Sequence, residues 1–240
     1  MIGIQTGSAE SALDVVKTAG RLHGHGTRSL LKSLLYKPTF RDWMQLNRSD
    51  SLVLRSINAT GTSAMLSTVC AALISSLEGL EPAITLHYFC KNFGQEHEKG
   101  GLHLLRSLIS QLLETWPADK PFTLDGDALS LPGDSQLWFL FKGALTSLPG
   151  ATVFCIIDGP EYYGHEEELQ STIRGLLWLA NTIPSQTNLK ILITSPFSNQ
   201  LMDLIPEDRH VFLNMSMHDK PDLGDDFASR ELVRHHISQQ

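Results

Sequence analysis

The feature that most restricts the fold of this chain is a set of short, unbroken apolar runs. The clearest is residues 151–157, Ala-Thr-Val-Phe-Cys-Ile-Ile, which Asp158 follows directly. Similar runs occupy residues 52–57, 83–90, 189–194 and 210–213. A β-strand that is apolar on both faces must be covered on both faces, which is typical of parallel sheets flanked by helices.

Amphipathic stretches with helical spacing separate most of these runs. They occupy residues 8–20, 27–36, 62–77, 101–116, 137–148, 166–181 and 225–237. The second should stop before Pro38, and residues 20–26 and 117–134, rich in Gly, Pro or Asp, are predicted loops. With right-handed crossovers, the pattern predicts the α/β class: a doubly wound, mostly parallel sheet with helices on both faces. We expect residues 1–50 to form a helical N-terminal flank and residues 51–240 the α/β domain.

Composition excludes several classes of protein. Of the 240 residues, 42% are hydrophobic and 19% charged, which suits a globular domain and not a disordered chain. The net charge of −7 argues against general nucleic-acid binding, and no apolar run reaches the roughly 18 residues of a transmembrane helix. No secretory signal is visible at the start, and Cys70, Cys90 and Cys155 lie far apart inside apolar runs. We therefore expect an intracellular, cytoplasmic protein with reduced cysteines, no specific nucleic-acid partner and no membrane association.

Charge is unevenly distributed along the chain. Between Lys17 and Arg48 there are seven basic residues and one acid, whereas between Asp203 and Glu231 there are eight acids and three basic residues. The two segments are either ordinary solvated faces or complementary surfaces that meet each other or a partner.

The segment after the first predicted strand has the position of a phosphate-binding loop. Laid on G-x-x-x-x-G-K-[ST], it reads Ser56, Ile57, Asn58, Ala59, Thr60, Gly61, Thr62, Ser63. In such a loop, backbone N–H groups at a helix N-terminus hold phosphate oxygens, a Lys neutralises them and a hydroxyl binds Mg²⁺. Gly61 and Ser63 remain here, but Ser56 replaces the first Gly and Thr62 replaces the Lys. The alternative is an ordinary turn between a strand and a helix.

Two further strand ends carry polar residues at the same predicted edge of the sheet. Asp158 has the place of the carboxylate that ends a Walker B strand and holds the water shell of Mg²⁺, and Glu161 follows three residues later. Thr194 ends another apolar strand, where a polar side chain can sense the γ-phosphate. The alternative for Asp158 is a structural cap for the next loop.

The order of these segments resembles the NACHT-type (STAND) NTPase domains of large fungal signalling proteins, of the nephrocystin-like kind. The matching residues are Phe40-Arg-Asp-Trp43, the loop at 56–63, Tyr88-Phe-Cys90, the stretch Leu105-Arg-Ser-Leu-Ile-Ser-Gln-Leu-Leu113, Asp158-Gly-Pro-Glu-Tyr162, and Lys190 to Pro196. The resemblance covers roughly residues 28–237. It implies a P-loop NTPase-like fold, and an ATP or GTP site with Mg²⁺ in which nucleotide state biases a closed or oligomeric form. No segment resembles the winged helix or repeats that accompany such domains, so we expect a piece of a longer protein or a reduced remnant.

The chain departs from this family pattern at its charged positions. Thr62 stands where the pattern has the P-loop Lys, and Tyr162 where it has a second acid that orients water, with Glu161 shifted to the preceding place. Pro196 follows Ser195 directly, so the usual Arg is missing. A hydrogen bond to a charged group is worth about 1.5–3 kcal/mol, so loss of the Lys alone should weaken nucleotide binding about ten- to a hundredfold.

Three functional hypotheses follow. The first is a degenerate NACHT-like module for regulation or protein interaction, with protein partners or self-association, in which binding of ATP or GTP with Mg²⁺ is weak or lost and at most weak NTPase activity remains. The second is an active Mg²⁺-nucleotide switch with an atypical loop, with Asp158 and Glu161 catalytic, Ser63 and Asp158 holding the metal, and Thr194 and loop residues 56 and 58–63 holding the nucleotide. The third is a sheet for an unrelated ligand with an accidental likeness, which a first strand not lying centrally beside the Asp158 strand would favour.

Overall fold

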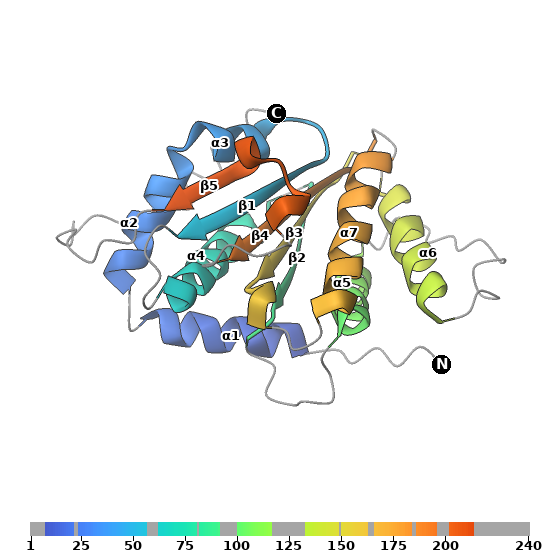
Figure 1. Cartoon of the computed structure of the whole chain (residues 1–240), viewed down its shortest axis with the longest axis horizontal. Helices are drawn as coiled ribbons and strands as arrows, with labels where there is room; N and C mark the ends of the chain where they lie inside the picture. Colours follow the sequence, from blue (N-terminus) through green and yellow to red (C-terminus); the bar gives the residue numbers. More distant parts are fainter. Residues whose placement is uncertain are drawn as a thin grey trace.

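One parallel sheet organises the structure, a computed structural model that describes residues 8–21, 24–56, 62–80, 82–91, 100–116, 133–148, 150–162, 166–183, 186–195 and 202–213. Its strands are β1 (Asp50–Ser56), β2 (Ala83–Phe89), β3 (Thr152–Asp158), β4 (Asn188–Ser195) and β5 (His210–Leu213). They lie in the order β2-β3-β4-β1-β5, and every pairing is parallel (Figure 1). The predicted strands and the parallel sheet are thus confirmed.

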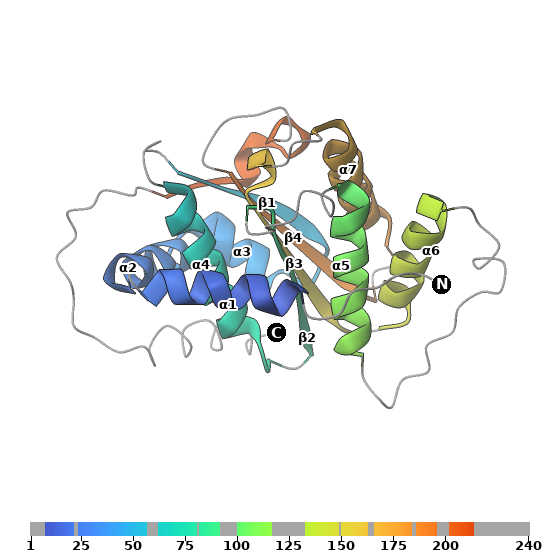
Figure 2. The same cartoon turned by 90° about the horizontal axis from the view of Figure 1, so that it is seen from below.

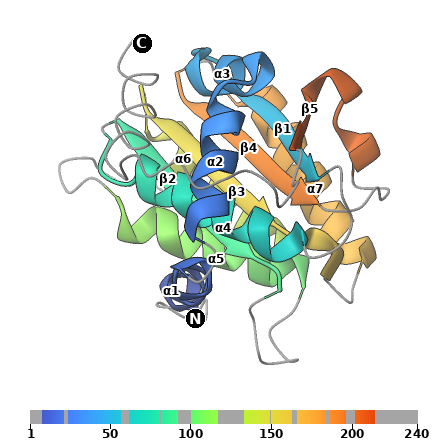
Figure 3. The ribbon, with the colours of Figure 1, turned by 90° about the vertical axis from the view of Figure 1, so that its left-hand side faces the viewer.

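Helices cover both faces of the sheet. One face carries α1 (Ser8–Arg21), α2 (Gly24–Leu35), α3 (Pro38–Gln45) and α4 (Thr62–Leu77), and Figure 3 looks onto this side with α1 seen end-on. The other face carries α5 (Gly101–Glu114), α6 (Gly133–Thr146) and α7 (Glu166–Thr182). Three short 3-10 turns complete the described elements: η3 (Pro160–Tyr162), η4 (Met202–Leu204) and η5 (Glu207–Arg209). The doubly wound α/β class is confirmed.

Alternation along each strand divides the interior into two apolar clusters. On β3, Val153, Cys155 and Ile157 face α5–α7, whereas Phe154 and Ile156 face α1–α4. Successive side chains of a strand point to opposite faces, so Asp158 falls on the α4 side. No helix among the described residues is long and apolar enough to cross a membrane.

The sequence missed one helix and misplaced the starts of two others. Helix α6 begins at Gly133, inside the predicted loop 117–134, and not at Leu137. Helix α3 begins at Pro38, which is favourable in a first helical turn, and its Trp43 packs between Phe40 and Phe154 with ring centroids 5.5 Å from each. Helix α2 begins at Gly24, inside the segment predicted as a loop, because tertiary packing overrides the low helix propensity of Gly. The predicted helix at 225–237 and the predicted loop residues 117–132 lie outside the described residues.

Strand β1 does not lie beside β3, the strand that ends in Asp158. Strand β4 lies between β1 and β3, and β5 lies on the other side of β1. Helix α4 nevertheless contacts β2, β3 and β4, so the helix that follows β1 reaches over the Asp158 strand. The helical segment 8–45 shares an apolar cluster with β1 and α4, and a domain boundary near residue 50 stays a prediction.

A buried lysine ties α3 to the amino-terminal edge of the sheet. Lys190 on β4 is 1% exposed, and its Nζ donates a hydrogen bond to the Leu46 carbonyl, at the C-cap of α3, over 2.5 Å. Burial lowers the pKa of Lys190 to about 8; Asp50 opposes this shift, and Arg48 and Arg209 add to it. Asp50 itself forms an ion pair with Arg209 at 3.2 Å.

We expect the Lys190 ammonium to make folding stability depend on alkaline pH. The folded protein releases this proton near pH 8, before the unfolded chain does near 10.5, so the free energy of unfolding should rise across this window, by at most about 3 kcal/mol. Urea unfolding at several pH values should show this rise in the wild type and in Lys32→Met, an exposed control. The Lys190→Met variant should lack it, and an equal rise in that variant would contradict the assignment.

Candidate functional site

The carboxylate of Asp158 is the centre of the candidate site. It ends β3 and is 4% exposed. The Ser67 hydroxyl of α4 donates to Oδ2 over 2.5 Å, and the Thr194 hydroxyl of β4 donates to Oδ1 over 2.5 Å. Both carboxylate oxygens therefore accept hydrogen bonds from the protein, and one side chain joins three elements.

The Thr194 hydroxyl is oriented to donate a hydrogen bond to Asp158. Thr194 is fully buried and pairs with Asp158 in the β3–β4 register. Its Oγ1 also accepts a hydrogen bond from the Gly159 N–H over 3.2 Å, which leaves the hydroxyl proton for Asp158. Gly159 has a φ of +64°, and a Cβ there would lie 2.9 Å from the Tyr162 ring, so the turn after β3 needs glycine.

Burial makes both acids of this site titrate near neutral pH. Burial raises the pKa of Asp158 to about 6, and the hydroxyls of Ser67 and Thr194 and the charge of Lys91 oppose the rise. Burial also raises the pKa of Glu161, to about 7; its own backbone N–H, the Ser195 hydroxyl and Lys91 oppose this, while the charge of Asp158 adds to it.

Lys91 brings a positive charge to the same edge of the sheet. It follows β2 after Cys90, and its Nζ lies 5.0 Å from the centroid of the Tyr162 ring. Its charge lowers the pKa of both Asp158 and Glu161. Sequence reasoning did not identify Lys91 as a cation at this edge. Its place directly after a predicted strand was the signal, because the carboxyl ends of parallel strands share one edge.

Some of the predicted site residues are brought together and others are not described. Asp158, Thr194 and Glu161 meet at the carboxyl edge of β3 and β4. Ser56 ends β1, two strands from β3, and pairs with Leu213 of β5. Thr62 and Ser63 are the first residues of α4. Their side chains, and all of Asn58, Ala59, Thr60 and Gly61, lie outside the described residues.

Ser67 is the second functional contact that sequence reasoning missed. It lies one helical turn after Ser63, so both residues occupy the same side of α4. The loop pattern ends at Ser63, and nothing in the pattern indicates that the next turn supplies the hydroxyl bonded to Asp158.

The two cysteines near this carboxylate, Cys70 and Cys90, are buried, which raises the pKa of each thiol well above its ordinary value.

The sequence matches a known domain family over most of its length. The profile of the family described as Nephrocystin 3, N-terminal, matches residues 30–196, which is more than half of the chain. The chain belongs to this family. The nephrocystin-3 N-terminal family is NACHT-like and P-loop NTPase-like, so the hypothesis of an accidental likeness is wrong. A first strand that does not lie beside the Asp158 strand is therefore compatible with membership of this family. Helix α4 bridges from β1 to Asp158 across β4.

Two solved structures are similar to this nephrocystin-3-type chain at 10–15% identity. No curated protein matches its sequence. A Walker-type ATPase of Pyrococcus abyssi is similar with a TM-score of 0.37 and 15% identity, over 65% of this chain and 43% of that chain. A structure of Drosophila ORC bound to DNA is similar with a TM-score of 0.43 and 10% identity, over 89% of this chain and 50% of that chain. The chain thus spans half or less of either solved chain.

In this nephrocystin-3-type domain, the predicted metal-side carboxylate Asp158 is engaged by protein donors. Mg²⁺ needs near-octahedral oxygen ligands, and the described part of the chain holds no group of three or more His, Cys, Asp or Glu side chains that could bind a metal ion. Both oxygens of Asp158 are already hydrogen bonded to Ser67 and Thr194. The carboxylate acts as a buried acceptor that fixes α4 to the sheet.

We expect Ser67→Ala to destabilise the protein by about 1–3 kcal/mol, because it leaves a buried carboxylate oxygen without its donor. The loss should be larger at pH 8 than at pH 5, since the missing donor stabilises the charged form of Asp158, whose pKa is about 6. Chemical unfolding at both pH values measures this.

Ser76→Ala is the matched control for this experiment. Ser76 lies on the same helix, and its hydroxyl donates to the neutral carbonyl of Ala72 over 2.8 Å. This variant should lose no more than about 1 kcal/mol, with no dependence on pH. Equal, pH-independent losses in the two variants would show that the Ser67–Asp158 contact has no special weight.

Proposed function

We propose that this nephrocystin-3-type domain acts as a regulatory or protein-interaction module in which binding of ATP or GTP with Mg²⁺ is weak or lost. The observation that supports the proposal most is the internal pairing of Asp158. The carboxylate in the Mg²⁺-side position is 4% exposed and accepts hydroxyl hydrogen bonds at both oxygens. To contact a metal's water shell, the carboxylate would first have to become accessible to water, because it is nearly fully buried.

The charges around the phosphate-binding positions support the same proposal. Thr62 replaces the Lys that would neutralise the β- and γ-phosphates, and Pro196 directly follows Ser195 in place of an Arg. Phosphoryl transfer depends almost entirely on positioning and charge neutralisation, so these losses act on one mechanism. We infer that the domain transmits signals through protein partners or self-association, not through hydrolysis.

The setting that we propose is cytoplasmic, without a nucleic-acid partner. The three cysteines are free and buried, which suits a reducing compartment. The net charge of −7 does not favour contact with phosphate backbones.

A second candidate function, an NTPase with an atypical loop, is favoured by Glu161 and Lys91. Burial raises the pKa of Glu161 to about 7, which suits a base able to accept a proton at neutral pH. Lys91 supplies a cation at the same edge. In this second candidate function, Glu161 activates water and Lys91 partly replaces the positive charge that is missing at Thr62.

Calorimetric titration with Mg·ATP and Mg·GTP tests the proposal. We expect no saturable binding below about 1 mM, because the missing Lys and the occupied Asp158 remove the main contacts with phosphate and metal. Binding tighter than about 10 µM that is lost in Asp158→Ala, and retained in the exposed control Asp134→Ala, would contradict it. Hydrolysis that falls in both Glu161→Gln and Lys91→Met would support the second candidate instead.

A further inference from the structure

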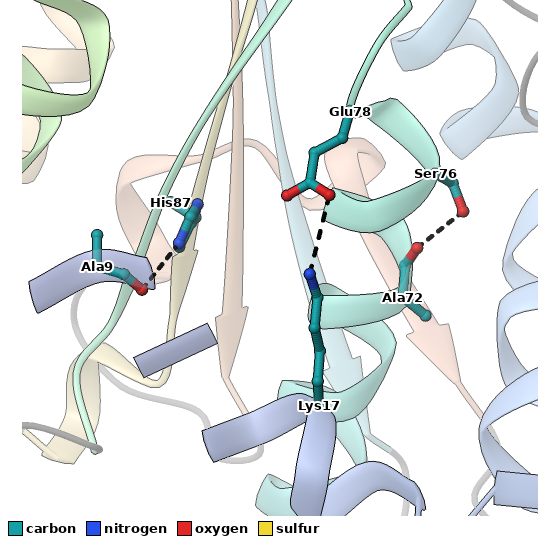
Figure 4. A network of polar contacts seen from close by, with 6 residues as sticks. All are labelled: Ala9, Lys17, Ala72, Ser76, Glu78 and His87. Atoms are coloured by element: carbon teal, nitrogen blue, oxygen red, sulfur yellow. Dashed lines mark hydrogen bonds and ion pairs between the residues drawn. The ribbon is translucent and has the colours of Figure 1, made fainter. Parts of the chain in front are cut away.

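A buried histidine connects the edge strand β2 to helix α1. His87 is 7% exposed and lies on the face of the sheet that α1–α4 cover. Its ring Nε2 is 3.2 Å from the carbonyl oxygen of Ala9 in the first turn of α1, as Figure 4 shows. A carbonyl only accepts hydrogen bonds, so Nε2 carries the ring proton. The other nitrogen, Nδ1, is then an unprotonated buried acceptor without a partner among the described residues.

The main chain of His87 is held separately from its ring. The Gln111 side chain of α5 accepts a hydrogen bond from the His87 N–H and donates one to its carbonyl, each over 2.9 Å. This amide pairs with β2 as a neighbouring strand would, on the edge opposite β3. A change at the His87 ring therefore acts on α1 and leaves the strand anchored.

Helix α1 crosses α4 (Figure 2) and also contacts β2, α2 and α5, so apolar packing provides most of its attachment. It buries four small or medium apolar side chains: Ala9, Ala12, Leu13 and Val16. Besides the His87 bond, Lys17 forms an ion pair with Glu78 at 3.8 Å. These two side chains are 33% and 50% exposed, and such surface pairs contribute little. The His87–Ala9 bond is therefore a large part of the polar attachment of α1.

We propose that α1 is a pH-sensitive latch, which closes over β2 and α4 while His87 is neutral and opens when the ring binds a second proton. A proton on Nδ1 would place a positive charge in a buried site where the described residues offer it no acceptor. The Nε2–H donor to Ala9 stays in place, so opening is driven by the cost of burying this charge. Opening would expose the apolar sides of α1 and of the surface under it. The latch does not involve the carboxyl edge of the sheet and is independent of the proposed function.

The elements packed against His87 carry both acidic and basic groups: Glu10, Asp14 and Lys17 on α1, Glu78 after α4, and Arg106 and Glu114 on α5. Carboxylates favour a charged ring and burial opposes it, and burial prevails at His87. Burial lowers the pKa of His87 from 6.5, the Ala9 carbonyl opposes this, and the charge of Lys17 adds to it. A folded-state pKa below the unfolded value means that docking is strongest above pH 6.5 and weakens as the pH falls below it.

Hydrogen exchange of the full chain, read by mass spectrometry at about pH 7.5 and about pH 5.5, tests the latch. After correction for the intrinsic exchange rate, amides in the last three turns of α1 should exchange faster at the lower pH, by up to about tenfold, while α4 and β3 keep their protection. Protection of α1 that does not change with pH, or loss of protection in β3 together with α1, would overturn the proposal.

Two glutamine variants assign the effect to one ring. In His87→Gln, the amide N–H₂ can replace the Nε2 donor but does not titrate, so α1 should stay protected at both pH values. His210→Gln is the matched control, because His210 Nε2 makes the same kind of bond, to the Ile205 carbonyl over 3.0 Å, on the distant edge strand β5. The His210→Gln variant should keep the wild-type pH response of α1. A pH response of α1 that survives in His87→Gln would exclude His87 as the sensor. The wild-type comparison needs no substitution, so it decides the matter even where a variant does not fold.

Discussion

The buried carboxylate of Asp158 is the interaction on which the arrangement of this domain depends. Moving a charged group out of water is costly unless hydrogen bonds compensate for it, and here the compensating hydroxyls come from different elements. Ser67 brings α4 to the end of β3, and Thr194 fixes the neighbouring end of β4. The helix that follows β1 is thereby tied to a strand that is not a neighbour of β1. The same bonds engage both oxygens of the carboxylate that the sequence predicted on the Mg²⁺ side of a nucleotide site.

Two other polar clusters show the same arrangement. In each, a buried polar group is hydrogen bonded by an element distant in sequence. At the amino edge, Lys190 donates to the end of α3. At the outer edge of the sheet, Gln111 pairs with the main chain of β2, while the His87 ring reaches α1. Each contact fastens a helix to the sheet. The His87 ring differs because its Nδ1 can take up a proton and has no partner among the described residues, which is why α1 is the helix inferred to detach.

Sequence reasoning predicted the parts of the fold that rest on local pattern. A run such as residues 151–157, apolar on both faces, has few alternatives to a central parallel strand, and Asp158 at its end was identified as the key carboxylate. Helix α3 was missed because Pro38 was taken only as a stop signal, although proline also suits a first helical turn. Ser67 and Lys91 were missed because their roles come from the packing of α4 and from the strand order, and neither is written in a local motif. The loop residues 58–61 stay predictions.

The most direct test of this account is the titration of the Asp158 carboxyl carbon, followed by NMR with and without Mg²⁺. If the carboxylate is a structural acceptor, its pKa should be about 6 in both conditions, because Ser67 and Thr194 and not a metal hold its oxygens. If Mg²⁺ instead lowers the pKa toward the ordinary value of 3.8, Asp158 contacts the metal or its water shell, and the account is contradicted.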